Sequence, residues 1–253
     1  MQIWLSIIIS TIAGLSTVLG SLVIFFKIKE ENINCFITFC LCFSVSVMIL
    51  ISILDLIPES SLFIINKYGQ IKGLFICLAT FLSGGVVVTI LTKLINKSTK
   101  NKNNNSLYKV GLLSMLTLIC HNFPEGILTF MASYKDLSLG ISLAIAIMFH
   151  NIPEGLSIAV PIYYSTKSKK KAIKHAFLSG LAEPIGAISA LIFLNKYIND
   201  TLINITLILV AGLMIFLSIN ELYPKALEYK EAKWGHLGLI SGVLVIIIQH
   251  FIL

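Results

Sequence analysis

The stretch "LSLGISLAIAIMFHNIPEGLSIAVPIYY" occupies residues 137–164 and is apolar along most of its length. The exception is "HNIPEG" at 150–155, which places a histidine, an asparagine, a proline and a glutamate near its middle. A membrane-spanning helix needs about 20 predominantly apolar residues. The stretch therefore predicts a transmembrane helix with polar side chains near mid-bilayer, where lipid makes them costly.

Seven other stretches share this apolar character and leave little of the chain outside them. They cover residues 3–26, 34–57, 72–95, 108–133, 172–195, 203–224 and 234–252. Only 12% of the 253 residues are charged and 57% are hydrophobic, whereas soluble domains carry about 25% charged residues. The sequence predicts an all-α, polytopic membrane protein with eight transmembrane helices, which form a single transmembrane domain over residues 1–253.

The lysines predict how the spans are oriented. Basic residues concentrate in cytoplasmic loops, and 15 of the 19 basic residues lie in or beside the connections after spans 1, 3, 5 and 7. We therefore expect these connections, including 96–106 and 166–174, to face the cytoplasm, and both termini to be extracytoplasmic. The same placement explains the net charge of +7 without a nucleic-acid partner.

Two pairs of similar motifs indicate internal repeats. "HNFPEG" at 121–126 lies in the fourth span and "HNIPEG" in the fifth, while "ISILDLIP" at 51–58 ends the second span and "LSINELYP" at 217–224 ends the seventh. The members of each pair lie on spans that cross the membrane in opposite directions. We therefore predict inverted repeats, spans 1–3 and 6–8, around a central pair formed by spans 4 and 5. Such 3+2+3 symmetry is typical of transporters.

Each HNxPEG motif places its histidine and glutamate four residues apart, so that both lie on one helix face. The asparagine lies about 100° round the helix from the histidine. The proline cannot donate a backbone hydrogen bond and is expected to kink the helix, and the glycine permits close helix approach. Antiparallel packing would bring six polar side chains together: His121, Asn122, Glu125, His150, Asn151 and Glu154.

Three glutamates lie near the middle of predicted spans, namely Glu125, Glu154 and Glu183 in "LAEPIGA". An acidic residue there costs roughly 2.5–3.5 kcal/mol on insertion scales, and a divalent cation can offset this cost. Imidazole with carboxylate suits zinc and other first-row metals, and carboxylates shared between two ions would form a two-metal site. Mixed nitrogen and oxygen ligands select poorly among Zn²⁺, Fe²⁺, Mn²⁺, Co²⁺ and Cd²⁺.

Other interpretations of these residues stay open at this point. Each buried polar residue could instead be a structural hydrogen-bonding group, and the asparagines could cap kinks. Asp55 and Glu221, in the second pair of motifs, could be solvated residues at helix ends. The functional interpretation places Asp55 at the outer entrance and Glu221 at the inner exit of a transport pathway.

The motifs "HNFPEG", "HNIPEG", "GLAEPIGA" and "LSINELYP", in this order, resemble those of the ZIP family of divalent metal transporters. The resemblance covers essentially the whole chain and is strongest to the broad-range bacterial members. It differs in the connection 96–106, which has no histidine, whereas many members of the family have a histidine-rich loop there.

The resemblance implies a zinc transporter of the bacterial inner (cell) membrane, with eight spans, extracytoplasmic termini and a homodimeric assembly. It also implies a binuclear metal site between spans 4, 5 and 6. By position, the primary site would use His121, Glu125, His150 and Glu154. The secondary site would share the glutamates and add Asn122, Asn151 and Glu183.

Three other functions are alternatives to transport. An intramembrane metalloprotease needs H-E-x-x-H, with the glutamate as general base, but here an asparagine follows each histidine. A proton-coupled carrier of a small organic solute would need a roomier cavity with apolar or aromatic lining. A metal sensor would need an effector domain, which the sequence does not predict. Uptake of divalent metal ions by a non-enzymatic transporter is therefore the predicted function.

Overall fold

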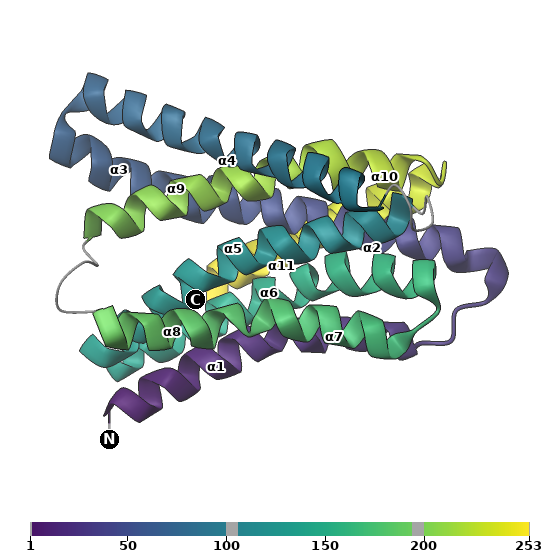
Figure 1. Ribbon diagram of the computed structural model, residues 1–253, viewed down its shortest axis with the longest axis horizontal. Helices are drawn as coiled ribbons and strands as arrows, with labels where there is room; N and C mark the ends of the chain where they lie inside the picture. The colour runs from purple at the N-terminus through teal and green to yellow at the C-terminus, as the bar shows by residue number, and fades with distance from the viewer. Residues whose placement is uncertain (1, 100–105, 194–199, 253) are drawn as a thin grey trace.

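The computed structural model describes residues 2–99, 106–193 and 200–252, which form helices joined by short turns, with no strand among them (Figure 1). Residues 100–105, inside the predicted 96–106 connection, lie outside this part of the chain. The α-helices are α1 (Gln2–Ser21), α2 (Ile33–Ile51), α3 (Ile57–Tyr68), α4 (Gln70–Thr99), α5 (Ser106–Lys135), α6 (Leu137–Thr166), α7 (Lys169–Gly180), α8 (Ala182–Phe193), α9 (Asp200–Leu217), α10 (Tyr223–Leu227) and α11 (Ala232–Ile252). Two 3₁₀ segments, Leu22–Phe25 and Glu30–Asn32, join α1 to α2.

The prediction of a polytopic helical membrane protein is confirmed. Within the described residues, seven helical segments are long and apolar enough to cross a membrane. The eighth predicted span is α5, which is 30 residues long and less apolar over its whole length than α6. Because α5 packs against α1, α6, α8 and α9, neighbouring helices cover this more polar span.

Two spans continue beyond their predicted ends. Each passes through a π-helical segment, Ser52–Leu56 after α2 and Ser218–Leu222 after α9. The proline that follows each segment, Pro58 or Pro224, occupies the first turn of the next helix, where its missing N–H costs least. Proline therefore does not end these spans, and the second one reaches Tyr68 rather than residue 57.

The sixth span is divided into α7 and α8 by a turn at Leu181. Pro184 has no N–H to donate to the carbonyl of Gly180, one helical turn earlier, and the regular helix is interrupted there. In contrast, α5 and α6 continue through Pro124 and Pro153.

The packing of the helices has the symmetry that the motifs predict. α1 packs on α6, as α8 packs on α5. α2 packs on α6 and on α11, as α9 packs on α5 and on α4. Exchange of span 1 with span 6, 2 with 7, 3 with 8 and 4 with 5 converts each of these contacts into its counterpart. The arrangement of inverted repeats around a central α5–α6 pair therefore follows from helix contacts as well as from sequence.

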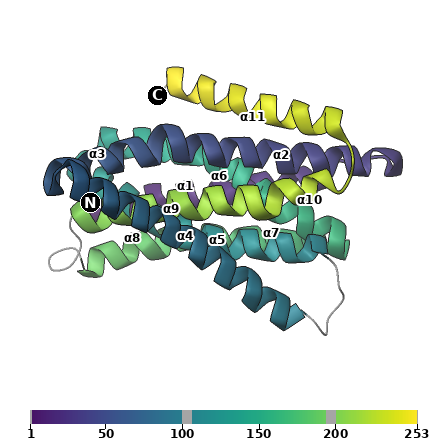
Figure 2. The ribbon, with the colours of Figure 1, turned by 90° about the horizontal axis from the view of Figure 1, so that it is seen from above.

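The connections fall into two sets at opposite ends of the bundle (Figures 1 and 2). The turns after α1, α6 and α10 lie at one end, and the turns after α3 and α5 lie at the other, toward which both chain termini point. The lysine-rich connections are those of the first set. This matches the charge asymmetry from which the orientation in the membrane was predicted.

Glycines bring the central helices into backbone contact. A Cβ atom on Gly155 of α6 would lie 2.0 Å from the carbonyl oxygen of Thr17 in α1, and one on Gly126 of α5 would lie 2.0 Å from that of Glu183 in α8. Real Cβ atoms do not approach so closely, and the obstructing atoms belong to rigid backbone. Both HNxPEG motifs thus end in a glycine on which the packing of a neighbouring span depends.

We expect Gly155→Ala to destabilise the protein, because the new methyl group must push α1 away from α6. Overpacking of this kind typically costs about 1–3 kcal/mol, and it should lower the apparent Tm of the protein purified in detergent. Gly235→Ala is the matched control, since its Cβ would meet its nearest neighbour, Cys42 Sγ, at 3.4 Å, an ordinary contact. Equal Tm values for the two variants would contradict this account of the packing.

Candidate metal centre

The two HNxPEG motifs meet in the middle of the antiparallel α5–α6 pair, with α1 and α8 packed against them. Because the histidine and the glutamate of each motif are four residues apart, they share a helix face, and this face points toward the other helix. The side chains predicted to bind metal are all almost completely buried: His121, Asn122, Glu125, His150, Asn151, Glu154 and Glu183. The helices therefore enclose the whole predicted set.

The histidines and the glutamates form one compact cluster. His121 Nε2 lies 3.2 Å from Glu125 Oε1 and 3.2 Å from Glu154 Oε1. His150 Nε2 lies 2.9 Å from the same oxygen of Glu125, and the two imidazole rings are 6.1 Å apart between centroids. One ligand atom each from His121, Glu125 and His150 lie within 4.8 Å of one another, close enough to hold a metal ion.

The asparagines and the third glutamate lie beside this cluster. The Asn151 amide donates to Glu183 Oε1 and, at 3.0 Å, to the carbonyl oxygen of Ala13 in α1. The Asn122 amide donates at 3.5 Å to the carbonyl oxygen of Ser179 in α7. Each amide is thus anchored through its nitrogen, which leaves its oxygen directed elsewhere. The sequence did not predict the two anchoring carbonyls, because backbone atoms leave no signal in residue type.

Many polar atoms of this cluster have no hydrogen-bond partner, although buried polar groups are normally satisfied. They are both carboxylate oxygens of Glu154, one each of Glu125 and Glu183, the side-chain oxygens of Asn122 and Asn151, Nδ1 of His150 and both ring nitrogens of His121. His121 Nε2 is close to two carboxylates and yet hydrogen-bonded to neither. Atoms that converge without bonding to one another are what a cation site requires.

Charge leads to the same conclusion. Three buried carboxylates face two imidazoles, which are neutral when they act as ligands. Ionised carboxylates in a low-dielectric interior are unfavourable unless they are paired or coordinate metal. A formal charge of −3 from Glu125, Glu154 and Glu183 is of the size that one or two divalent cations would balance. Oxygen and imidazole ligands in this mixture suit Zn²⁺ and other first-row divalent metals.

Asp55 and Glu221 lie outside this cluster, in the two π-helical segments. Both are partly buried, and Glu221 Oε1 accepts a hydrogen bond from Thr92 Oγ1 of α4 at 2.9 Å. π-Turns inside helices are rare and occur often at functional sites. The motif pair that suggested the second repeat therefore coincides with two equivalent irregularities of the backbone.

Comparison with known proteins identifies the family of this chain. The sequence profile of the ZIP Zinc transporter family matches residues 92–249. The chain belongs to the ZIP family. It is 37% identical to a protein of Oceanobacillus iheyensis described as Zinc transporter ZupT, over 98% of each chain. It is also similar to proteins of the same description from Streptococcus mutans (35% identical, over 98% of this chain and 97% of the relative) and Campylobacter jejuni (32%, over 96% and 94%).

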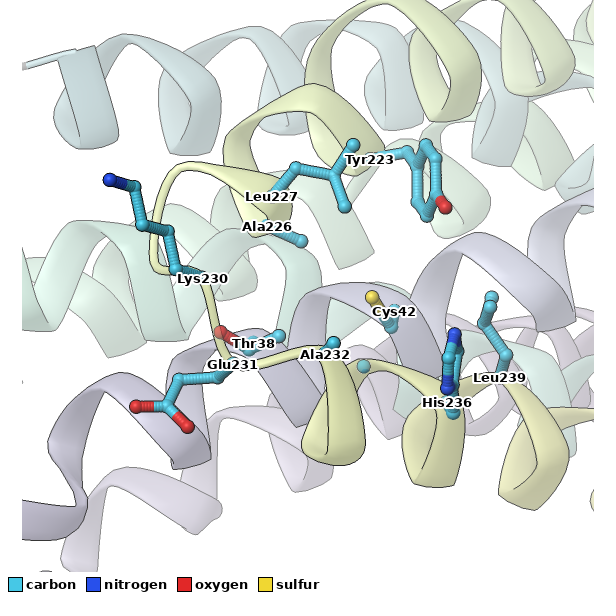
Figure 3. Close-up of a pocket in the computed structure, with 11 residues that line it drawn as sticks. Thr38, Cys42, Tyr223, Ala226, Leu227, Lys230, Glu231, Ala232, His236 and Leu239 are labelled. Atoms are coloured by element: carbon cyan, nitrogen blue, oxygen red, sulfur yellow. The ribbon is translucent and has the colours of Figure 1, made fainter.

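The ZIP-family chain also has a separate cavity of about 120 Å³ between α2, α10 and α11 (Figure 3). Thr38, Cys42 and His236 line it, whereas the charged ends of Lys230 and Glu231 point away from its centre. Within the part of the chain that the structure describes, the ligand-type residues that lie close enough together to hold an ion are His121, Glu125 and His150, in α5 and α6. Among the described residues, those that line the cavity of Figure 3 form no comparable group of three ligand-type side chains.

Zn²⁺ should raise the apparent Tm of the purified protein, because an ion that binds the folded state alone stabilises it. The gain is about 2.7 kcal/mol when free Zn²⁺ is 100-fold above its Kd, and EDTA should reverse it. His121→Ala and Glu125→Ala should remove most of the shift, whereas His236→Ala, outside the cluster, should keep it. Thermal unfolding with and without Zn²⁺ measures this, and an undiminished shift in the two cluster variants would place the ion elsewhere.

Proposed function

We propose that this ZIP-family protein is a membrane transporter, not an enzyme, and that it carries Zn²⁺ into the cytoplasm. The observation that carries the proposal is the set of buried, partnerless polar atoms at the centre of a bundle of apolar helices. Such groups are expensive in a membrane and mark ion pathways. Membership of a family of zinc transporters supports the same function and speaks against the metalloprotease.

Two ions bind side by side in this proposal. His121, Glu125, His150 and Glu154 hold the primary ion between α5 and α6. Asn122, Asn151 and Glu183 hold the secondary ion and share Glu125 and Glu154 with the first. In support, Glu125 Oε1 already lies within 3.2 Å of both histidines while its Oε2 has no partner. A carboxylate with one oxygen at the histidines and the other oxygen free of hydrogen bonds is suited to bridge two ions.

The ligand set extends the substrates to Fe²⁺, Mn²⁺, Co²⁺ and Cd²⁺. Imidazole nitrogen binds borderline-soft cations well, and carboxylate or amide oxygen binds the harder ones. The set contains no thiolate, which would favour soft cations strongly. Release into the cytoplasm follows when water or protons replace the ion at the histidines and carboxylates.

In the proposed orientation in the bacterial inner membrane, the lysine-rich end of the bundle faces the cytoplasm and both termini lie outside. Lipid covers the exposed aliphatic face of α4, which includes Leu74, Leu78, Leu82 and Val86. The working unit is a homodimer, and residues 1–253 act as one transport domain. Relative movement of the two repeats opens the site to one side of the membrane and then to the other, as in other carriers built from inverted repeats.

Radiolabelled Zn²⁺ uptake into proteoliposomes tests the proposed function. His121→Ala, Glu125→Ala and Glu154→Ala should each lower uptake at least about tenfold, since even residues outside the ligand set of a metal cost 10–100-fold when they are lost. His236→Ala should transport as the wild type does. Wild-type uptake in all three cluster variants, at equal protein levels in the vesicles, would refute the assignment.

Asp55→Asn and Glu221→Gln test the proposed pathway separately from the binding site. Each change removes a charge from a π-turn near one end of the route and should slow Zn²⁺ uptake about 2- to 5-fold, or less than about 1 kcal/mol of barrier. The shift of Tm with Zn²⁺ should stay at the wild-type value, because neither residue belongs to the group of side chains proposed to bind the ion. Unchanged uptake in both variants would contradict the proposed pathway and would indicate that Asp55 and Glu221 are solvated residues at helix ends.

A further inference from the structure

The inverted repeat extends into the first span, where it pairs a threonine with a metal-site glutamate. Residues 14–20 read "GLSTVLG" in α1, and residues 180–186 read "GLAEPIG" at the junction of α7 and α8. The two glycines and the leucine coincide at the same spacing. In this register Thr17 occupies the position of Glu183.

The helix contacts support this register. A Cβ on Gly14 would lie 2.4 Å from the carbonyl oxygen of Gly180, and a Cβ on Gly180 would lie 2.4 Å from that of Gly14. The first glycines of the two segments therefore pack on one another reciprocally, as residues on a twofold axis do. The spans that carry them cross at this point.

The second glycines obey the same symmetry. A Cβ on Gly20 would lie 2.0 Å from the carbonyl oxygen of Ile152, and a Cβ on Gly186 would lie 2.1 Å from that of Phe123. Ile152 and Phe123 are the third residues of the two HNxPEG motifs. The motif glycines make the reciprocal contacts: a Cβ on Gly155 would lie 2.0 Å from the carbonyl oxygen of Thr17, and a Cβ on Gly126 would lie 2.0 Å from that of Glu183.

The side chains at the paired positions occupy corresponding places. The Cβ of Glu183 lies over Gly14, and the Cβ of Thr17 lies over Gly180. Asn151 is anchored to the carbonyl oxygen of Ala13, and Asn122 to that of Ser179, which precede the first glycines of the two segments.

Asn151 also donates to Glu183, and the symmetric neighbour of Asn122 is Thr17. The Thr17 hydroxyl and the Asn122 side-chain oxygen are both buried without a hydrogen-bond partner. By the symmetry, Thr17 should lie beside Asn122 as Glu183 lies beside Asn151. The two oxygens without a partner therefore belong to residues that the symmetry places next to each other.

We infer that Thr17 is the α1 counterpart of Glu183 and a further lining residue of the metal site, where its hydroxyl supports the Asn122 half. The inference rests on the proposed binding of two ions and specifies how they are held. The half formed by Asn151 and Glu183 is acidic, whereas the half formed by Asn122 and Thr17 is neutral. The secondary ion is therefore drawn toward α8 and away from α1.

Exchange of the two residues tests the inference directly. Calorimetric titration of the purified protein with Zn²⁺ should find two ions in the wild type. Glu183→Thr should weaken the second ion at least about tenfold. The double variant Thr17→Glu with Glu183→Thr should restore it, because Gly180 leaves room beneath residue 17 as Gly14 does beneath residue 183. A double variant that keeps the first ion but binds the second no better than Glu183→Thr overturns the inference.

A milder pair of variants decides the matter where the exchanged protein fails to fold. Thr17→Val removes the hydroxyl at constant shape and should weaken the second ion about 2- to 10-fold, the size of one hydrogen bond. Thr17→Ser should keep wild-type affinity. Wild-type affinity in Thr17→Val reduces Thr17 to a packing residue. A wild type that binds no Zn²⁺ would instead refute the proposed function, which separates the two failures.

Discussion

The structure depends on one electrostatic constraint, the burial of three carboxylates and two imidazoles among apolar helices. Glu154 and Glu183 are wholly buried, and Glu125 nearly so. Lipid and apolar side chains cannot solvate them, and their own contacts leave many of their atoms without a partner. Each of the surrounding features, from the antiparallel α5–α6 pair to the anchored amides, keeps these groups close enough for a divalent cation to compensate them.

Glycine makes that proximity possible, because α1 and α8 approach the two motifs to the distance of backbone contact. Where Gly126 and Gly155 face the Glu183 and Thr17 carbonyls, a larger residue would separate the spans. The ligand groups would then move apart with the backbones that carry them. Metal binding and helix packing are thus linked through the last residue of each HNxPEG motif. The motif combines ligands and a contact surface in six positions.

Much of this organisation could be predicted from the sequence, since the decisive patterns are local. The spacing of His121 and Glu125 fixes a shared helix face, and the long apolar stretches fix the spans. The continuation of the second span past Pro58 was missed, because a π-turn is a backbone irregularity that residue type does not announce. The turn at Leu181 was missed for a similar reason, although Pro184 provided a signal. Thr17 was missed because a threonine in an apolar span is ordinary until its structural counterpart is known.

The departures from symmetry make the two halves of the site chemically different. A perfectly twofold site would present the same ligands to both repeats and would release an ion to either side equally well. Here one half of the site has the Glu183 carboxylate and the other has the Thr17 hydroxyl, so the two repeats compete unequally for the secondary ion. The two π-helical segments also differ in place, since the one with Asp55 leads into α3, toward the end that holds the termini, and the one with Glu221 leads into α10, at the lysine-rich end. Symmetric packing with asymmetric charge allows two related conformations whose affinities for the secondary ion differ, and binding of that ion then shifts the balance between them.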